Sequence, residues 1–128
     1  MGNTRFARGL KKLEEIDGDA GKKVIESLAA IAPDLAKYTI EFPFGDIYER
    51  PGLDLIKREI ATVAALTALG NCLPQLHVHI HGALNVGVKP EEVVEIIIQM
   101  AVYAGFPAAL NAMFVAKEVF QERDIIAA

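Results

Sequence analysis

Residues 70–107 read GNCLPQLHVHIHGALNVGVKPEEVVEIIIQMAVYAGFP, and three glycines in this stretch each stand shortly before a proline. The pairs are Gly70 with Pro74, Gly87 with Pro90, and Gly105 with Pro107. Glycine is favoured just past the end of a helix, and proline is favoured in the first turn of the next helix. The stretch therefore predicts three helix-to-helix junctions in an all-α fold.

The rest of the sequence also favours helices. After Pro90, polar residues recur at every fourth position from Glu91 to Tyr103, and nearly everything between them is apolar, which is typical of a helix buried on most sides. The helices expected in the second half are Leu53–Leu69, Pro74–Val86, Pro90–Ala104 and Pro107–Arg123. Those expected in the first half are Thr4–Glu15, Ala20–Ala32 and Asp34–Glu41, interrupted at Pro33 and Pro43. Residues 44–52 (FGDIYERPG) are expected to form a loop or a short helical turn.

Length and composition indicate one domain over residues 1–128 that associates with copies of itself. Hydrophobic residues make up 52% of the 128-residue chain, and the mean hydropathy is +0.29. A short domain buries only part of such a surplus, so exposed apolar surface and a homo-oligomer are expected. The net charge of −4 argues against a nucleic-acid partner. With one cysteine and no recognisable signal peptide, a cytoplasmic location is expected.

The uncharged stretch 96–116 is long enough to span a membrane. However, Gly105-Phe106-Pro107 lies in its middle and would break a spanning helix. Two buried helices joined by a tight turn are therefore predicted, and no membrane contact.

All three histidines lie in His77-Val78-His79-Ile80-His81. On a helix, His77 and His81 share one face and His79 points roughly the opposite way. A spacing of four lets two histidines bind one metal ion, but the sequence shows neither a HExxH motif nor a recognisable third ligand. No metal site is predicted, and His77 and His81 are interpreted as surface or interface residues.

Several motifs occur in one order along the chain. They are 44-FGDIYERPGL-53, 57-KRE-59, Gln75-Leu76-x-x-His79-x-x-x-Ala83-Leu84, Gly87-Val88, 90-PEE-92 and 103-YAGFPA-108. Across roughly residues 30–120 this order resembles the carboxymuconolactone decarboxylase family, which includes the alkylhydroperoxidase D-like proteins. The resemblance implies an all-α subunit in a ring-like homo-oligomer, a trimer or hexamer, without bound cofactor or metal. It also implies decarboxylation of 4-carboxymuconolactone, a step of aromatic catabolism.

The peroxidase-like branch of that family carries a Glu, a Cys-x-x-Cys pair and a His. Here Glu59 and His79 occupy the outer positions and Cys72 the first Cys position, but Gln75 replaces the second Cys. Without a dithiol, disulfide cycling within one subunit is impossible. The sequence therefore favours the decarboxylase branch over a peroxidase.

The chemistry implied needs a proton donor and a carboxylate-binding cation. His79 is the expected general acid or oxyanion donor, and Glu59 is expected to orient it or to relay its proton. Arg50 is preferred to Arg58 as the clamp for a small anionic substrate, because Arg58 is expected to face solvent. Tyr103 is a further candidate for substrate contact, with packing as its alternative. Two other functions stay open: a thiol-dependent peroxidase or disulfide reductase using Cys72, and a non-catalytic oligomer that binds a small anion.

Overall fold

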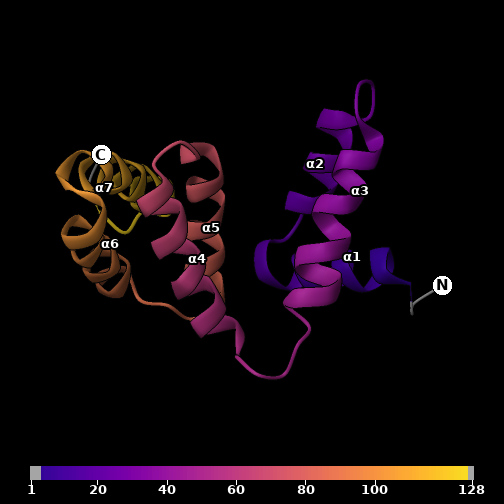
Figure 1. The fold of residues 1–128 in the computed structure, drawn as a ribbon, viewed down its shortest axis with the longest axis horizontal. Helices are drawn as coiled ribbons and strands as arrows, with labels where there is room; N and C mark the ends of the chain where they lie inside the picture. The colour runs from indigo at the N-terminus through magenta and orange to yellow at the C-terminus, as the bar shows by residue number, and fades with distance from the viewer. Residues whose placement is uncertain (1–3, 127–128) are drawn as a thin grey trace. The chain divides into compact units, whose positions relative to one another are not determined.

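The computed structural model describes residues 4–126, and all regular structure in this range is helical. The α-helices are α1 (Arg5–Asp17), α2 (Ala20–Leu28), α3 (Pro33–Ile40), α4 (Leu55–Leu69), α5 (Leu73–Val86), α6 (Pro90–Ala104) and α7 (Phe106–Glu122), and η1 (Glu41–Ile47) is a π-helix. The all-α prediction is confirmed. The chain divides after Asp54 into two compact units: α1–α3 with η1 form the first, and α4–α7 form the second (Figure 1).

The second unit is a four-helix arrangement in which α4 packs against α5 and α6, and α7 packs against the same two helices. The three predicted junctions are confirmed, since Gly70, Gly87 and Gly105 all have positive φ at the ends of α4, α5 and α6. One cluster of buried side chains fills its core. The cluster consists of Val63, Leu76, Ile80, Ala83, Val88, Val93, Ile97, Ala109, Ala112, Ala116, Val119 and Phe120.

The uncharged stretch 96–116 forms the end of α6 and most of α7, separated at Gly105 as predicted. Among the described residues, no helix combines the length and the apolar character that crossing a bilayer requires.

In the first unit, α1 packs closely against η1. Gly9 and Gly45 lie at this contact, where a Cβ on Gly9 would overlap the carbonyl oxygen of Ile40 and one on Gly45 would lie 2.5 Å from that of Arg5. The Arg5 guanidinium also binds the Asp46 carboxylate through two nitrogens, with distances down to 2.6 Å. This hydrogen bond, aided by the charge of Arg5, lowers the pKa of Asp46 below 3.8. The two glycines, which allow close backbone contact, and the Arg5–Asp46 ion pair therefore hold α1 against η1.

The α-helix predicted before Pro43 ends at Ile40, but the chain is not broken at the proline and continues through it as the π-helix η1. Proline has no N–H to donate, so a regular α-helix cannot pass through this position with all its bonds intact. The chain instead widens into η1, where the Tyr48 N–H donates to the Pro43 carbonyl at 2.7 Å. Residues 44–47 are therefore helical, in agreement with the predicted short helical turn, and residues 48–52 form turns and loop. The predicted extension of α2 to Ala32 is wrong, since α2 ends at Leu28 and residues 29–31 form turns. Pro33 accounts for Ala32 alone, which has an extended φ of −153°.

Candidate functional site

Glu59 lies on the face of α4 that packs into the core. It is followed at intervals of four by Val63 and Thr67, and all three side chains are buried. A carboxylate in such a position is costly unless another polar group compensates it. A fully buried glutamate on an otherwise packed helix face is therefore the first sign of a site in the second unit.

That compensating group is His79. On α5, the Nδ1 atom of His79 lies 3.0 Å from Oε1 of Glu59. The His79 side chain is 22% exposed whereas that of Glu59 is fully enclosed. A buried carboxylate thus holds a histidine that still reaches solvent, which is the arrangement expected of a group that exchanges protons with a ligand.

The contact also determines which ring nitrogen can act. When the Glu59 carboxylate accepts a hydrogen bond from Nδ1–H, the transferable proton of His79 is the one at Nε2. The second carboxylate oxygen, Oε2 of Glu59, is buried and has no hydrogen-bond partner among residues 4–126. A buried acceptor without a donor is rare in folded proteins and is characteristic of functional sites.

The structure brings Glu59 and His79 together. Arg58 precedes Glu59 on α4; its side chain is half-buried and its Nε atom is enclosed, so the expectation that it faces solvent is wrong. Tyr103 is 78% exposed near the end of α6. Arg50 is exposed and belongs to the first unit, so its role as a clamp stays a prediction.

Cys72 lies directly before α5 and is half-buried, with its Sγ atom 3.5 Å from the carbonyl oxygen of Leu66. In this contact the thiol serves as a hydrogen-bond donor to the backbone. Gln75, at the position of the missing second cysteine, is exposed on the first turn of α5. This geometry gives no support to a thiol-based reaction.

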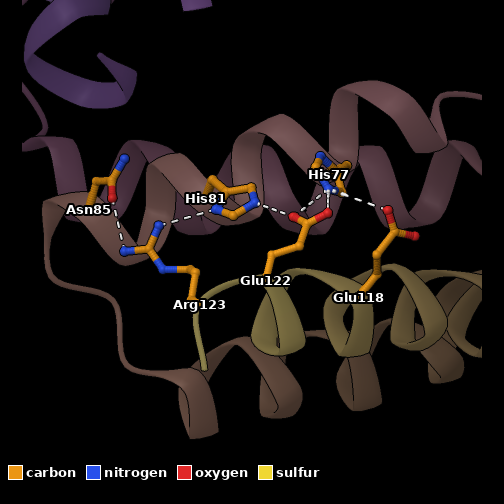
Figure 2. A network of polar contacts seen from close by, with 6 residues as sticks. All are labelled: His77, His81, Asn85, Glu118, Glu122 and Arg123. Atoms are coloured by element: carbon orange, nitrogen blue, oxygen red, sulfur yellow. Dashed lines mark hydrogen bonds and ion pairs between the residues drawn. The ribbon is translucent and has the colours of Figure 1, made fainter. Parts of the chain in front are cut away.

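His77 and His81 leave α5 on another side and contact α7, as the predicted helix geometry requires (Figure 2). Both Nε2 atoms lie within hydrogen-bond distance of Glu122, at 2.9 and 2.7 Å from its Oε1. The hydrogen bond from His81 is the main cause that lowers the pKa of Glu122 below 4.5. Sequence reasoning missed Glu122 because it lies far along the chain, and only the packing of α7 on α5 brings it near.

A groove of about 420 Å³ lies along α4 and α6, but three of its lining residues are Glu91, Glu92 and Glu95. Their negative charges would repel a carboxylated substrate. The groove is therefore a poor candidate for the anion-binding part of the site.

These features define a class of protein: an all-helical domain in which a buried carboxylate on one helix positions a partly exposed histidine on the next. Residues 33–118 match the carboxymuconolactone decarboxylase family, and the chain belongs to this family. The matched range begins at α3 in the first unit and ends in α7 of the second, so the family pattern includes parts of both units.

Three relatives are similar along much of the chain. A 4-carboxymuconolactone decarboxylase of Acinetobacter baylyi is 34% identical over 122 residues, which cover 94% of this chain and 90% of the relative. An uncharacterised 15.0 kDa protein of Paracoccus denitrificans is 32% identical over 78% of this chain and 75% of its own. A nitrosuccinic acid decarboxylase of Metarhizium robertsii is 33% identical over 64% of this chain and 57% of its own.

Proposed function

We propose that this protein is a decarboxylase of a small carboxylated lactone or a related anion, and that it works without a cofactor. Two relatives named as decarboxylases of different acids support the reaction type. The observation that carries the proposal is the 3.0 Å contact between the buried Glu59 and His79. 4-Carboxymuconolactone is the reference substrate, since the relative with the longest match is named for it.

The proposed reaction breaks the bond between the substrate carbon and its carboxylate and releases carbon dioxide. The electron pair of that bond passes to a carbon conjugated with the lactone carbonyl, which gives an enolate-like anion. The carbonyl serves as the electron sink, so the reaction needs no added electron acceptor. A proton must then reach the anion, and a hydrogen-bond donor near the carbonyl oxygen would stabilise the charge that develops there.

His79 is the proposed donor of that proton through Nε2, and it regains a proton from water after each turnover. Glu59 is a positioning residue in this scheme. Its carboxylate fixes the ring through Nδ1 and stabilises the protonated imidazole, while the core around α4 excludes water from the carboxylate.

The substrate carboxylate needs a cation, and arginine suits this role because its planar fork binds both oxygens. Arg50 is the proposed clamp, with Arg58 as the second arginine to test. Arg58 is adjacent to Glu59 in sequence, and its enclosed Nε limits the movement of its guanidinium. Tyr103 is the remaining candidate for substrate contact.

Replacement of the proton donor tests the proposal directly. His79→Gln should keep the helical content but lower turnover of 4-carboxymuconolactone by roughly 10²- to 10⁴-fold, the usual contribution of a general acid. The matched control is Gln75→Ala, an exposed change one turn earlier on the same helix, and its turnover should equal that of the parent. Parental turnover in His79→Gln would show that His79 is structural and that the proposed function is wrong.

Glu59→Gln separates positioning from chemistry. The amide can either accept from or donate to Nδ1, so it no longer enforces one tautomer. Turnover should fall by roughly 10- to 100-fold with little change in KM, and the pH dependence of kcat should shift. An unchanged pH profile would indicate that Glu59 only fills space.

The alternative that uses Cys72 predicts that activity is lost when the thiol is removed, whereas the decarboxylase proposal predicts little change. Cys72→Ser should retain decarboxylase turnover within about twofold, because a hydroxyl can also donate to the Leu66 carbonyl. A peroxidase assay with external dithiol provides the comparison. Peroxide reduction that disappears in Cys72→Ser would favour the thiol function instead.

We also propose that the protein is a homo-oligomer, a ring-like trimer or hexamer. Within this chain, large apolar side chains remain exposed in rows on α6 and α7 and on the segment from residue 31 to 42. The rows consist of Val102, Phe106, Leu110 and Phe114, and of Ile31, Leu35, Tyr38 and Phe42, each 52% exposed or more. Large apolar side chains left exposed in this way are typical of an interface, and a second copy of the chain is the proposed occupant.

Light scattering should therefore give a mass several times 13.9 kDa. Phe114→Glu should reduce that mass without loss of helix, because Phe114 is 64% exposed in the single chain. Lys117→Glu, also exposed on α7, is the control and should leave the mass unchanged. A parent that is monomeric at micromolar concentration would contradict the oligomer.

A further inference from the structure

We infer that His77, His81 and Glu122 form a binding site for a late first-row divalent cation, with Zn²⁺ as the reference ion, that links α5 to α7. One ligand atom from each of the three residues lies within 4.8 Å of the others. The inference concerns a different side of α5 from Glu59 and His79. It is therefore independent of the proposed decarboxylase function.

The donor set selects the class of cation. Two imidazoles and one carboxylate are typical ligands of Zn²⁺, whereas Mg²⁺ and Ca²⁺ prefer oxygen ligands alone. His77 and His81 are one helical turn apart, so their rings lie on one side of α5, with centroids 5.0 Å apart. Glu122 supplies the third ligand from the last turn of α7 (Figure 2).

The distances also fit. The Nε2 atoms of His77 and His81 lie 2.9 and 2.7 Å from Oε1 of Glu122, because hydrogen bonds join them. Ligands bound tetrahedrally at about 2.0 Å are separated by roughly 3.3 Å. Binding therefore requires each Nε2–Oε1 distance to lengthen by about half an ångström and the two histidine ligand atoms, which lie within 4.8 Å of each other, to adjust to the same spacing. The protons between the ligand atoms must also leave.

The ligand side chains remain accessible to an ion from solvent. The side chains of His77, His81 and Glu122 are 30%, 21% and 44% exposed. Three protein ligands leave a fourth coordination position for water. Glu118, whose carboxylate lies 3.5 Å from Nε2 of His77, approaches only one of the two histidines and is not assigned as a ligand.

In this structure Arg123 makes a contact with His81 that is incompatible with a cation bound at Nε2. Its guanidinium donates to Nδ1 of His81 at 3.1 Å and to the Asn85 side chain at 3.0 Å. Since Nδ1 accepts this bond, the proton of a neutral His81 is on Nε2, the atom that a cation needs. Arg123 must therefore move away before His81 can bind an ion through Nε2, and it acts as a gate on the site.

The experiment uses the full chain without a histidine tag, treated with a chelator and then titrated with Zn²⁺ in a calorimeter. We expect one ion per chain with a Kd on the order of micromolar. His81→Gln and Glu122→Gln each remove one ligand from opposite helices, and each should weaken binding at least about tenfold. Circular dichroism in chelator must show parental helix content in both variants.

Two control variants separate coordination from general attraction of charge. Glu118→Gln removes a negative charge one turn before Glu122 and should change the Kd by less than about threefold. Arg123→Gln should tighten binding by roughly tenfold, because the glutamine carbonyl can accept from Nδ1–H of His81. Lys117→Gln removes the same positive charge from α7, away from the three ligands, and should tighten binding much less.

Co²⁺ provides a readout that does not depend on affinity alone. The parent should give the intense visible absorption of tetrahedral Co²⁺, and Glu122→Gln should lose it. The inference is overturned if Zn²⁺ binds more weakly than about 1 mM. It is equally overturned if Glu118→Gln weakens binding as much as Glu122→Gln, or if His81→Gln leaves binding unchanged.

Discussion

The two units of the chain are stabilised in different ways. Among residues 4–126, the second unit buries twelve apolar side chains in one cluster, whereas the first buries five, namely Leu13, Ile16, Ala36, Ile40 and Phe44. The first unit relies more on close backbone contact at Gly9 and Gly45 and on the Arg5–Asp46 ion pair. A cluster of twelve side chains can support a buried charge, and it is this unit that contains Glu59.

This difference predicts where each unit is vulnerable. A large apolar cluster loses stability when a side chain is shortened, because a cavity remains. A contact made through glycines loses stability when a side chain is lengthened, because two backbones can no longer approach.

The largest expected effect is in the second unit. Ile97→Ala removes most of a fully buried side chain from α6 and should lower the free energy of unfolding by about 2–5 kcal/mol. Ile56→Ala, at a position 39% exposed on α4, should cost less than about 1 kcal/mol.

Chemical denaturation measures both values, and hydrogen exchange resolved by peptide locates the change. Protection should be lost mainly in residues 55–126 of Ile97→Ala. Equal loss in residues 4–54 would show that the two units unfold as one, and the distinction between them would then have no thermodynamic meaning.

The opposite change should destabilise the first unit. Gly45→Ala places a methyl group against the Arg5 carbonyl and should cost about 1–3 kcal/mol. Gly52→Ala is the matched control in the same unit, since nothing lies within 4 Å of its added Cβ. We expect exchange protection in residues 4–54 to fall in the first variant only. Parental stability in Gly45→Ala would mean that α1 and η1 separate at little cost.

The fold of the second unit could be predicted because its signals are local. Each glycine–proline pair restricts the backbone at the position where one helix must end and the next begin. The first unit was harder, since the outcome at Pro43 depends on tertiary contact. The hydrogen bond that proline cannot donate can either end a helix or convert it into a π-helix. Here the chain forms the π-helix η1, and α1 packs against it at Gly45.

The candidate site could also be predicted only in part from the sequence. His79 and Glu59 could be paired because the family resemblance places both at matching positions, and helix geometry separates His79 from its two neighbours. Glu122 could not be found, because 41 residues separate it from His81 and no short motif links them. The exposure of Tyr103 was also not predictable, since an apolar ring beside a glycine–proline turn suits a core and an interface equally well.

The smallest expected effect concerns the Arg5–Asp46 pair, the polar counterpart of the glycine contact in the first unit. Because Arg5 lowers the pKa of Asp46 in the folded protein, the carboxylate contributes stability above its unfolded pKa of 3.8, and this contribution is lost as pH falls through the lower folded value. At pH 7, Asp46→Asn should therefore melt below the parent, though only by a few degrees, since the pair is partly exposed and screened by salt. The difference in melting temperature should stay constant from pH 7 to about pH 5, begin to shrink as pH falls below 3.8, and disappear only once pH has fallen through the lower folded pKa. Arg5→Gln should lower the melting temperature by a similar amount, and the double variant should be no worse than either single one. If the two losses instead add, the side chains act separately, and close backbone contact alone would hold α1 on η1.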